Sequence, residues 1–324
     1  MSYLDAPLRF AYKTVNGVDI PTDVYIPHTA KPAPVLIMIH GGAFMLGHAG
    51  MNNKDQILDC LDRGWIVVAI EHRLCPGVNV LEGPMTDIRD ALKWVQTGEL
   101  ANFMQGQGIT TVSPDARRVM VMGTSSGGHL ALCTGWDVSK KPLAILDFYG
   151  AKHFGDPSWY EPLASMPVDR FPAPSSEEEM SVRSESTIFV GGVSLEGQAD
   201  SSSPSDPKSR LGFALHQIST GNVIKTIWPQ APQHLKAIDP MLNVSSDFPP
   251  TAIVHGTADD MIPMHLSKAF EQVLRDHHIE TEFIEVEGEK HTFCGQMEKG
   301  SKTWDTQRKG FDFLERIVER SYVR

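Results

Sequence analysis

One serine in the chain has the surroundings that nucleophilic catalysis needs. Ser125 is the central residue of a Gly-x-Ser-x-Gly pentapeptide, 123–127, which follows four apolar residues and precedes a run of small residues. This pattern predicts a strand, a sharp turn and a helix, in which the glycines avoid collisions with neighbouring backbone. Such a turn would present the Ser125 hydroxyl at the end of a sheet. The alternative interpretation is a glycine-rich turn with an incidental serine.

A serine hydroxyl becomes a useful nucleophile only with a base beside it and a third group that orients the base. Asp259 and His291 lie in two later loops, each expected just after a strand on the same sheet edge as Ser125. The chain order Ser, Asp, His is typical of this kind of turn. The sequence therefore predicts that Ser125, His291 and Asp259 form one line of proton transfer.

Neighbouring acidic residues and histidines leave alternatives open. Asp260 is the adjacent rival to Asp259, and either of them could be a solvated surface charge. Asp147 ends its own predicted strand and is interpreted as structural. His255 also ends a strand, so we expect it to brace the following loop rather than to titrate.

A second glycine-rich loop is expected to support the serine. Residues 40–44 read His-Gly-Gly-Ala-Phe and follow the first buried strand. Backbone N–H groups placed here can face the oxygen that becomes negative when a carbonyl is attacked, and losing one such donor costs roughly a hundred- to a thousandfold in rate. We expect the amides of Gly42, Ala43 and Ser126 to form this oxyanion hole. The alternative is that the glycines only permit a tight loop.

Several aromatic residues and histidines are candidates for substrate contact, although packing is the alternative use for each of them. These candidates are Phe44, His129, His153, Trp159 and Trp228. The four cysteines are scattered without a C-x-x-C motif, so no metal site is predicted and no cofactor is implied.

Strand and helix patterns alternate around these motifs. The predicted strands are 9–15, 18–26, 35–39, 66–70, 119–122, 143–146, 251–255 and 282–286, and the predicted helices are 53–63, 84–96, 266–274, 311–318 and one directly after Ser125. Asn16 and Gly17 indicate a hairpin between the first two strands. The alternation predicts an α/β fold with a doubly wound, mostly parallel sheet and an antiparallel edge.

The alternation stops between residues 152 and 246, which are rich in proline, serine and acidic residues, including the stretch 201–207. We expect one helix here, over 209–228, and aromatic anchors at Trp159, Tyr160 and Trp228. A long insertion without strands in a compact domain is typical of a lid or a disordered insert, and the aromatic residues favour a packed lid. The predicted organisation is a core of residues 1–151 and 247–324 with a lid or cap at 152–246.

Composition limits the classes of function. The chain has 324 residues, 41% hydrophobic and 21% charged, with a net charge of -11. This is the profile of an ordinary soluble domain, and the negative charge argues against binding of nucleic acid. The apolar runs are too short to span a membrane, and the first residues lack the pattern of a secretory signal. We expect a cytoplasmic protein that does not bind membranes; its oligomeric state is not indicated.

Together, the pentapeptide 123–127, the loop 40–44, Asp259 and His291 resemble the α/β-hydrolase superfamily. The nearest branch is the esterases similar to hormone-sensitive lipase, the carboxylesterases and the kynurenine formamidases, with a likeness to fungal hydrolases. The run 71–76 is similar to a Tyr-Arg-Leu-Ala-Pro run of that branch. This likeness implies that Arg73 is structural, and we expect it to pair with Asp87 or Asp90. The chain departs from the family at Ala43, where a third glycine is usual, and the resemblance fades over 152–246.

The resemblance implies a serine hydrolase that acts on a carboxylic ester or related acyl bond of a small molecule, with the Ser125, His291 and Asp259 triad and an acyl-enzyme intermediate. One alternative is a thioesterase or lactonase that releases or tailors a polyketide-like acyl product. Another, from a different class, is a small-molecule binding protein on this fold that has lost catalysis. A non-hydrolytic rearrangement is also open.

Overall fold

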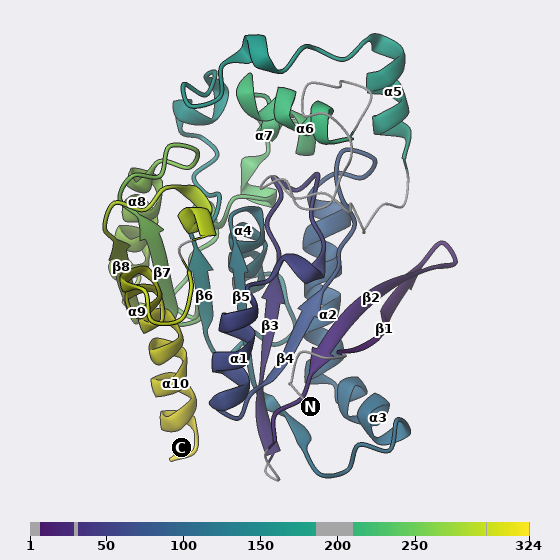
Figure 1. Ribbon diagram of the computed structural model, residues 1–324, viewed down its shortest axis with the longest axis vertical. Helices are drawn as coiled ribbons and strands as arrows, with labels where there is room; N and C mark the ends of the chain where they lie inside the picture. The colour runs from purple at the N-terminus through teal and green to yellow at the C-terminus, as the bar shows by residue number, and fades with distance from the viewer. Residues whose placement is uncertain (1–6, 29–31, 186–209, 296, 324) are drawn as a thin grey trace.

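A single twisted sheet runs through the computed structural model, which describes residues 7–28, 32–185, 210–295 and 297–323 (Figure 1). Within these residues the strands are β1 (Leu8–Val15), β2 (Val18–Tyr25), β3 (Pro32–Ile39), β4 (Ile66–Ile70), β5 (Ser113–Thr124), β6 (Ile145–Phe148), β7 (Thr251–Gly256) and β8 (Thr281–Val286). The predictions for the first six residues and for the stretch 201–207 lie outside the described residues.

The strand order is β1-β2-β4-β3-β5-β6-β7-β8. The hairpin of β1 and β2 is antiparallel and pairs antiparallel with β4, whereas the strands from β4 to β8 are all parallel. The prediction of a mostly parallel sheet with an antiparallel edge is confirmed. Because parallel strands end at one edge of the sheet, the loops after β3, β5, β7 and β8 meet there.

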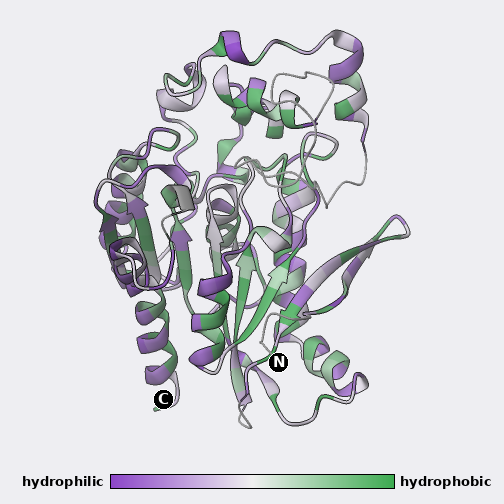
Figure 2. Ribbon diagram, viewed as in Figure 1, coloured by the Kyte–Doolittle hydropathy of each residue, from purple (hydrophilic) through white to green (hydrophobic). Residues whose placement is uncertain are grey.

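Helices cover both faces of the sheet. One apolar cluster joins the strands to α2 (Thr86–Gln96), α4 (Ser126–Leu132) and α8 (Met264–Asp276), and a second joins them to α1 (Lys54–Asp62) and α10 (Lys309–Ser321). Figure 2 shows hydrophobic central strands between helices that carry polar residues on their outer sides. This is the pattern expected of strands buried on both faces. The sequence did not predict α3 (Glu99–Gly106) or α9 (Lys302–Gln307).

The ion pair expected at Arg73 is present. Its guanidinium lies 2.7 Å from the Asp87 carboxylate, which is fully buried, and its backbone N–H donates to the same side chain at 2.9 Å. Asp90 instead pairs with Lys13, at 2.6 Å. The interaction ties the loop after β4 to the start of α2.

Residues 152–185 and 210–246 contain α5 (Ser176–Ser184), α6 (Arg210–Ser219) and α7 (Val223–Ile227), and these three helices lie beyond the carboxyl ends of the central strands (Figure 1). The prediction of one helix over 209–228 is wrong. The chain breaks between α6 and α7, where Gly221 has φ +68° and a side chain at that glycine would lie 2.4 Å from the Glu161 carbonyl oxygen. The division of the chain into core and lid stays a prediction.

Within the described parts of the chain, no helix combines the length and the apolar character that crossing a membrane requires.

Candidate active site

Ser125 lies in a strained turn between β5 and α4. Its backbone has φ 54° and ψ -121°, outside the regions that a side chain ordinarily permits. A Cβ at Gly123 would lie 2.0 Å from the Gly127 carbonyl oxygen, and one at Gly127 would lie 2.3 Å from the Ile39 carbonyl oxygen. The glycines are therefore required by the close approach of strand, turn and helix, as the pentapeptide predicts.

The structure brings the three predicted catalytic residues together. His291 Nε2 lies 3.0 Å from Ser125 Oγ, and His291 Nδ1 lies 2.8 Å from Asp259 Oδ2. Ser125 is 7% exposed and His291 is 5% exposed, so the line of contacts is shielded from water but reachable at the serine. Because the Asp259 carboxylate can only accept, His291 Nδ1 carries the proton, and Nε2 accepts the hydrogen bond of the Ser125 hydroxyl.

Asp259 is held by four donors. Oδ1 accepts from the backbone N–H groups of Met261 and Ile262, each at 2.9 Å, and Oδ2 faces His291 and, at 3.2 Å, His255 Nε2. Burial alone would raise the pKa of Asp259, but hydrogen bonds from His255 and His291 outweigh burial and hold that pKa well below its usual value. The carboxylate is thus ionised at neutral pH and fixed in orientation.

The rival residues lie elsewhere. Asp260 is exposed and its carboxylate pairs with Lys290 at 3.2 Å, whereas Asp259 is the acid that contacts His291. Asp147 is buried in an ion pair with Lys152 at 2.6 Å, which agrees with its structural interpretation. His255 Nε2 lies 2.9 Å from the Ile262 carbonyl oxygen, so it does brace the loop that carries Asp259.

The glycine-rich loop after β3 adopts an unusual backbone. Gly42, Ala43 and Phe44 have φ values of 126°, 52° and 65°, and the N–H groups of Met45 and Leu46 donate to the Gly42 carbonyl oxygen. A Cβ at Gly42 would lie 2.2 Å from the Leu46 carbonyl oxygen, so only glycine fits there. The loop lies beside Ser125, and the oxyanion-hole role of its amides stays a prediction.

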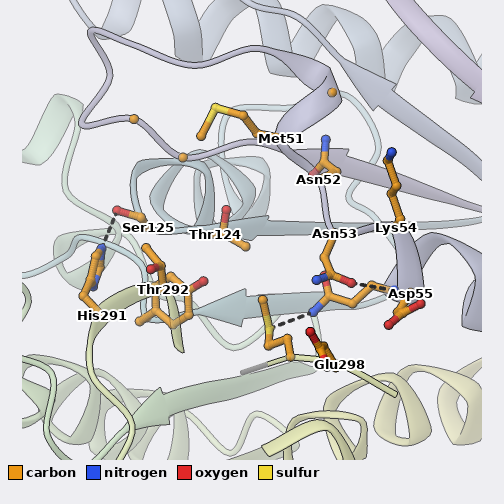
Figure 3. Close-up of a pocket in the computed structure, with 16 residues that line it drawn as sticks. Met51, Asn52, Asn53, Lys54, Asp55, Thr124, Ser125, His291, Thr292 and Glu298 are labelled. Atoms are coloured by element: carbon orange, nitrogen blue, oxygen red, sulfur yellow. Dashed lines mark hydrogen bonds between the residues drawn. The ribbon is translucent and has the colours of Figure 1, made fainter. Parts of the chain in front are cut away.

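Two cavities meet at Ser125 and His291. The larger has a volume of about 580 Å³ and a lining of mixed polar and apolar surface (Figure 3). Figure 3 shows the hydrogen-bonded Ser125 and His291 at one end of this cavity and the side chains of Asn53, Lys54 and Asp55 at the other. Its lining is Gly41, Gly42, Gly50, Met51, Asn52, Asn53, Lys54, Asp55, Gln56, Thr124, Ser125, Tyr149, His291, Thr292, Met297 and Glu298.

The smaller cavity has a volume of about 50 Å³ and a mostly apolar lining. Trp159, Ile218 and Val223 reach it from the helical segment beyond the strands. The rest of its lining is Ala43, Phe44, Ser125, Ser126, Ala151, Met261, Ile262 and His291. Ser125 thus faces a roomy cavity of mixed polarity on one side and a narrow apolar cavity on the other.

Of the five predicted substrate contacts, Phe44 and Trp159 line the smaller cavity, and the other three line neither cavity. His129 is fully buried, with its ring stacked on Phe154 at 4.8 Å and its Nδ1 2.9 Å from the Ala151 carbonyl oxygen. Burial lowers the pKa of His129 to about 3. The imidazole is a neutral packing group beneath the site.

His153 and Trp228 also serve the helical segment. The His153 N–H donates to Asp239 at 3.0 Å, and the Trp228 indole donates to the Gln233 carbonyl oxygen at 3.3 Å. The polar residues 52–56 of the larger cavity were not predicted from the sequence, although they lie a few residues after the glycine-rich loop, at the start of α1. The contact of Ile218 with the smaller cavity was also not predicted, and its place on an apolar helix face was the sequence signal that could have indicated it.

Among the described residues, no group of three or more His, Cys, Asp or Glu side chains is placed to hold a metal ion.

The most similar sequences include segments of much longer proteins. A non-reducing polyketide synthase of Acremonium egyptiacum is 30% identical over 339 residues, which cover 97% of this chain but 15% of that protein. Another, of Stereocaulon alpinum, is 29% identical over 332 residues, which cover 95% of this chain and 13% of that protein.

Solved structures share the fold at low sequence identity. Esterase 2 of Thermogutta terrifontis, phosphoramylated by tabun, has a TM-score of 0.63 and 19% identity, with 97% of this chain and 96% of that chain covered. A Staphylococcus aureus protein of unknown function has a TM-score of 0.69 and 19% identity, with 96% and 99% covered. A family model named BD-FAE matches residues 22–274, well over half of the chain. The chain therefore belongs to the BD-FAE family, and it has the α/β-hydrolase fold that its motifs resemble.

Proposed function

We propose that the protein is a serine hydrolase that cleaves a carboxylic ester through an acyl-enzyme intermediate. The observation that carries this proposal is the buried line from Ser125 Oγ through His291 to Asp259, at 3.0 and 2.8 Å, which opens on two cavities. A hydroxyl, an imidazole and a carboxylate in this geometry form the arrangement that activates a serine for acyl transfer.

In this mechanism His291 Nε2 takes the proton of Ser125 as Oγ attacks the ester carbonyl carbon. The carbonyl oxygen becomes an oxyanion, which the amides of Gly42, Ala43 and Ser126 stabilise. When the tetrahedral intermediate collapses, the bond to the leaving oxygen breaks and His291 returns the proton to that oxygen, which releases an alcohol. Asp259 stabilises the imidazolium and keeps its own charge.

Deacylation repeats the same steps with water. His291 takes a proton from a water molecule, whose oxygen attacks the acyl carbon, and then gives the proton back to Ser125 Oγ as the carboxylic acid leaves. Over the full cycle one water is consumed and one alcohol and one carboxylic acid are released: the proton of Ser125 leaves with the alcohol, and a proton from water replaces it on Oγ. No atom changes its oxidation state, so the chemistry needs no redox partner.

The two cavities indicate where the two parts of a substrate bind. We assign a short apolar acyl chain to the small cavity beside Ala43 and Ile218, and a larger polar leaving group to the cavity lined by residues 52–56. Apolar surface transferred into an apolar recess contributes roughly 25 cal/mol per Å², whereas polar groups lose free energy there unless they find hydrogen-bond partners.

A second candidate is a thioesterase that releases a bulky polyketide-like acyl group from a carrier. Two observations favour it. The chain is similar over nearly its whole length to segments of non-reducing polyketide synthases, and the larger cavity, of about 580 Å³, has room for a polar, oxygen-rich acyl group. The protein would then belong to secondary metabolism, and the bulky group would occupy the larger cavity.

Labelling with a fluorophosphonate tests the nucleophile, because the reagent modifies only an activated serine. We expect covalent modification of Ser125, no labelling in Ser125→Ala, and strongly reduced labelling in His291→Ala. Labelling that persists in Ser125→Ala, or that maps to Ser126, would contradict the assignment. A wild-type protein that resists the reagent would instead favour a binding protein.

A matched panel separates the two candidates. Esters of short acyl groups with polar alcohols are compared with thioesters of bulky hydroxylated aromatic acids, at equal concentrations. Higher kcat/KM for the short esters supports the esterase proposal, and higher kcat/KM for the bulky thioesters supports the thioesterase.

A further inference from the structure

Behind Asp259 a chain of buried polar side chains continues into the core. Lys152 lies 2.6 Å from Asp147 and donates to Ser267 Oγ at 2.8 Å. Ser267 Oγ lies 2.8 Å from His255 Nδ1, and His255 Nε2 lies 3.2 Å from Asp259 Oδ2. Asp147, Lys152, Ser267 and His255 are each 0% exposed. They come from the end of β6, the loop after it, α8 and the end of β7.

The donors and acceptors of this row of hydrogen-bonded side chains match when His255 accepts at Nδ1 and donates from Nε2. An ammonium group has no acceptor, so Lys152 donates to Ser267 Oγ, and the Ser267 hydroxyl proton is left to donate to His255 Nδ1. His255 Nε2 faces two acceptors, Asp259 Oδ2 and the Ile262 carbonyl oxygen at 2.9 Å, so it carries the proton. The chain therefore presents an N–H to Asp259 from inside the protein.

This arrangement gives Asp259 two histidines with different surroundings. His291 reaches Oδ2 from the side of Ser125, and His255 reaches the same oxygen from the core. An imidazole held at both nitrogens cannot rotate, because rotation would leave buried donors and acceptors without partners. At the far end of this row of side chains, Lys152 and Asp147 form an ion pair with no net charge, so the row adds no uncompensated charge to the core.

We propose that His255, held by Ser267 and Lys152, is a positioning residue that fixes the Asp259 carboxylate for catalysis. The inference rests on the proposed function, because it assigns the role through the proposed partnership of Asp259 and His291. It goes beyond bracing of the loop: the backbone N–H groups of Met261 and Ile262 already hold Oδ1, whereas His255 acts on the oxygen that His291 uses.

Three variants and one control test the proposal on the full chain. His255→Leu removes the N–H that faces Asp259, and His255→Gln restores an N–H at a similar distance from the backbone. Ser267→Ala removes the hydroxyl that donates to His255. Thr22→Val is the matched control, because it removes one buried hydroxyl that donates to the Ala69 carbonyl oxygen on the opposite edge of the sheet.

We expect His255→Leu to lower kcat roughly ten- to a hundredfold, the effect of losing one hydrogen bond to a charged group, with KM changed by less than about twofold. His255→Gln recovers most of the loss. Ser267→Ala lowers kcat roughly two- to tenfold, and Thr22→Val leaves kcat unchanged. If His255→Leu fails to fold, as judged by circular dichroism, Ser267→Ala and His255→Gln carry the test.

The proposal is overturned if folded His255→Leu or Ser267→Ala keeps the wild-type kcat, or if His255→Gln gives no recovery. The proposed function fails separately, when the wild-type protein itself shows neither turnover nor fluorophosphonate labelling of Ser125. If the wild-type enzyme is labelled and active and the variants are unaffected, the positioning role of His255 is wrong and the proposed function stands.

Discussion

The carboxyl edge of the sheet and the helical segment beyond it contribute to the same site in different ways. At the sheet edge, Ser125, Asp259 and His291 follow strand ends and are fixed by backbone geometry and buried hydrogen bonds. The helical segment contributes apolar side chains, such as Ile218 and Val223, that close the smaller cavity. In the proposed mechanism the chemistry therefore depends on a few exact contacts, whereas the choice of substrate depends on the shape of a cavity that many packed residues form together.

The largest expected effect belongs to the sheet edge. Asp259→Asn should lower kcat by roughly 10⁴-fold, because an amide in place of the carboxylate favours the wrong tautomer of His291 and cannot stabilise the imidazolium. Asp260→Asn is the matched control and should change kcat by less than about twofold, since Asp260 pairs with Lys290 at the surface.

Steady-state kinetics and the rate of fluorophosphonate labelling measure both variants of this pair. A large loss in Asp260→Asn with little loss in Asp259→Asn would show that the loop is assigned one residue out of register.

The helical segment should show a smaller effect, on selectivity rather than on rate. Ile218→Ala enlarges the apolar cavity, so the ratio of kcat/KM for a longer acyl chain to that for acetyl should rise about tenfold. Ile224→Ala, a buried residue of α7 outside that lining, should leave the ratio unchanged. The ratio is measured with a series of esters of one alcohol. If it is unchanged in Ile218→Ala, the acyl chain must be assigned to the larger cavity instead.

The smallest effect concerns stability in the layer beneath both regions. Burial lowers the pKa of His129 to about 3 from an ordinary 6.5, and burial also lowers the pKa values of His40 and His72. Below pH 6.5 the unfolded chain binds protons that these imidazoles do not bind in the fold. The free energy of unfolding should therefore be fully retained above pH 6.5 and should fall on acidification, by about 1.4 kcal/mol per pH unit for one such group.

Urea unfolding at pH 7.5, 6 and 5 measures that slope. His129→Gln should make the slope shallower by about 1 kcal/mol per pH unit, and His277→Gln, at an exposed helix end, should leave it as in the wild type. A slope in His129→Gln equal to that of the wild type would rule out His129 as a source of the pH dependence.

The sequence predicted those features whose signals are local. Apolar runs located the strands. Gly123 is required by the Gly127 carbonyl within the turn and Gly127 by the Ile39 carbonyl of β3, but both belong to one local pentapeptide pattern, which indicates the geometry of Ser125. The break between α6 and α7 at Gly221 was not predicted, because it depends on the Glu161 carbonyl, which lies sixty residues away in the chain. The burial of His129 and the row of hydrogen-bonded side chains behind Asp259 were not predicted for the same reason. Each depends on contacts between distant segments, which no local sequence pattern records.

The position of Ser125 between two unequal cavities has a consequence for the order of events. With the acyl chain held in the narrow recess, an alcohol can diffuse out of the wide one before hydrolysis begins, and water can enter by the path that the alcohol vacates. Added alcohols would compete with water along that same path. Such an enzyme would transfer its acyl group to a second alcohol in proportion to the concentration supplied, and the wider cavity would decide the ratio of transfer to hydrolysis.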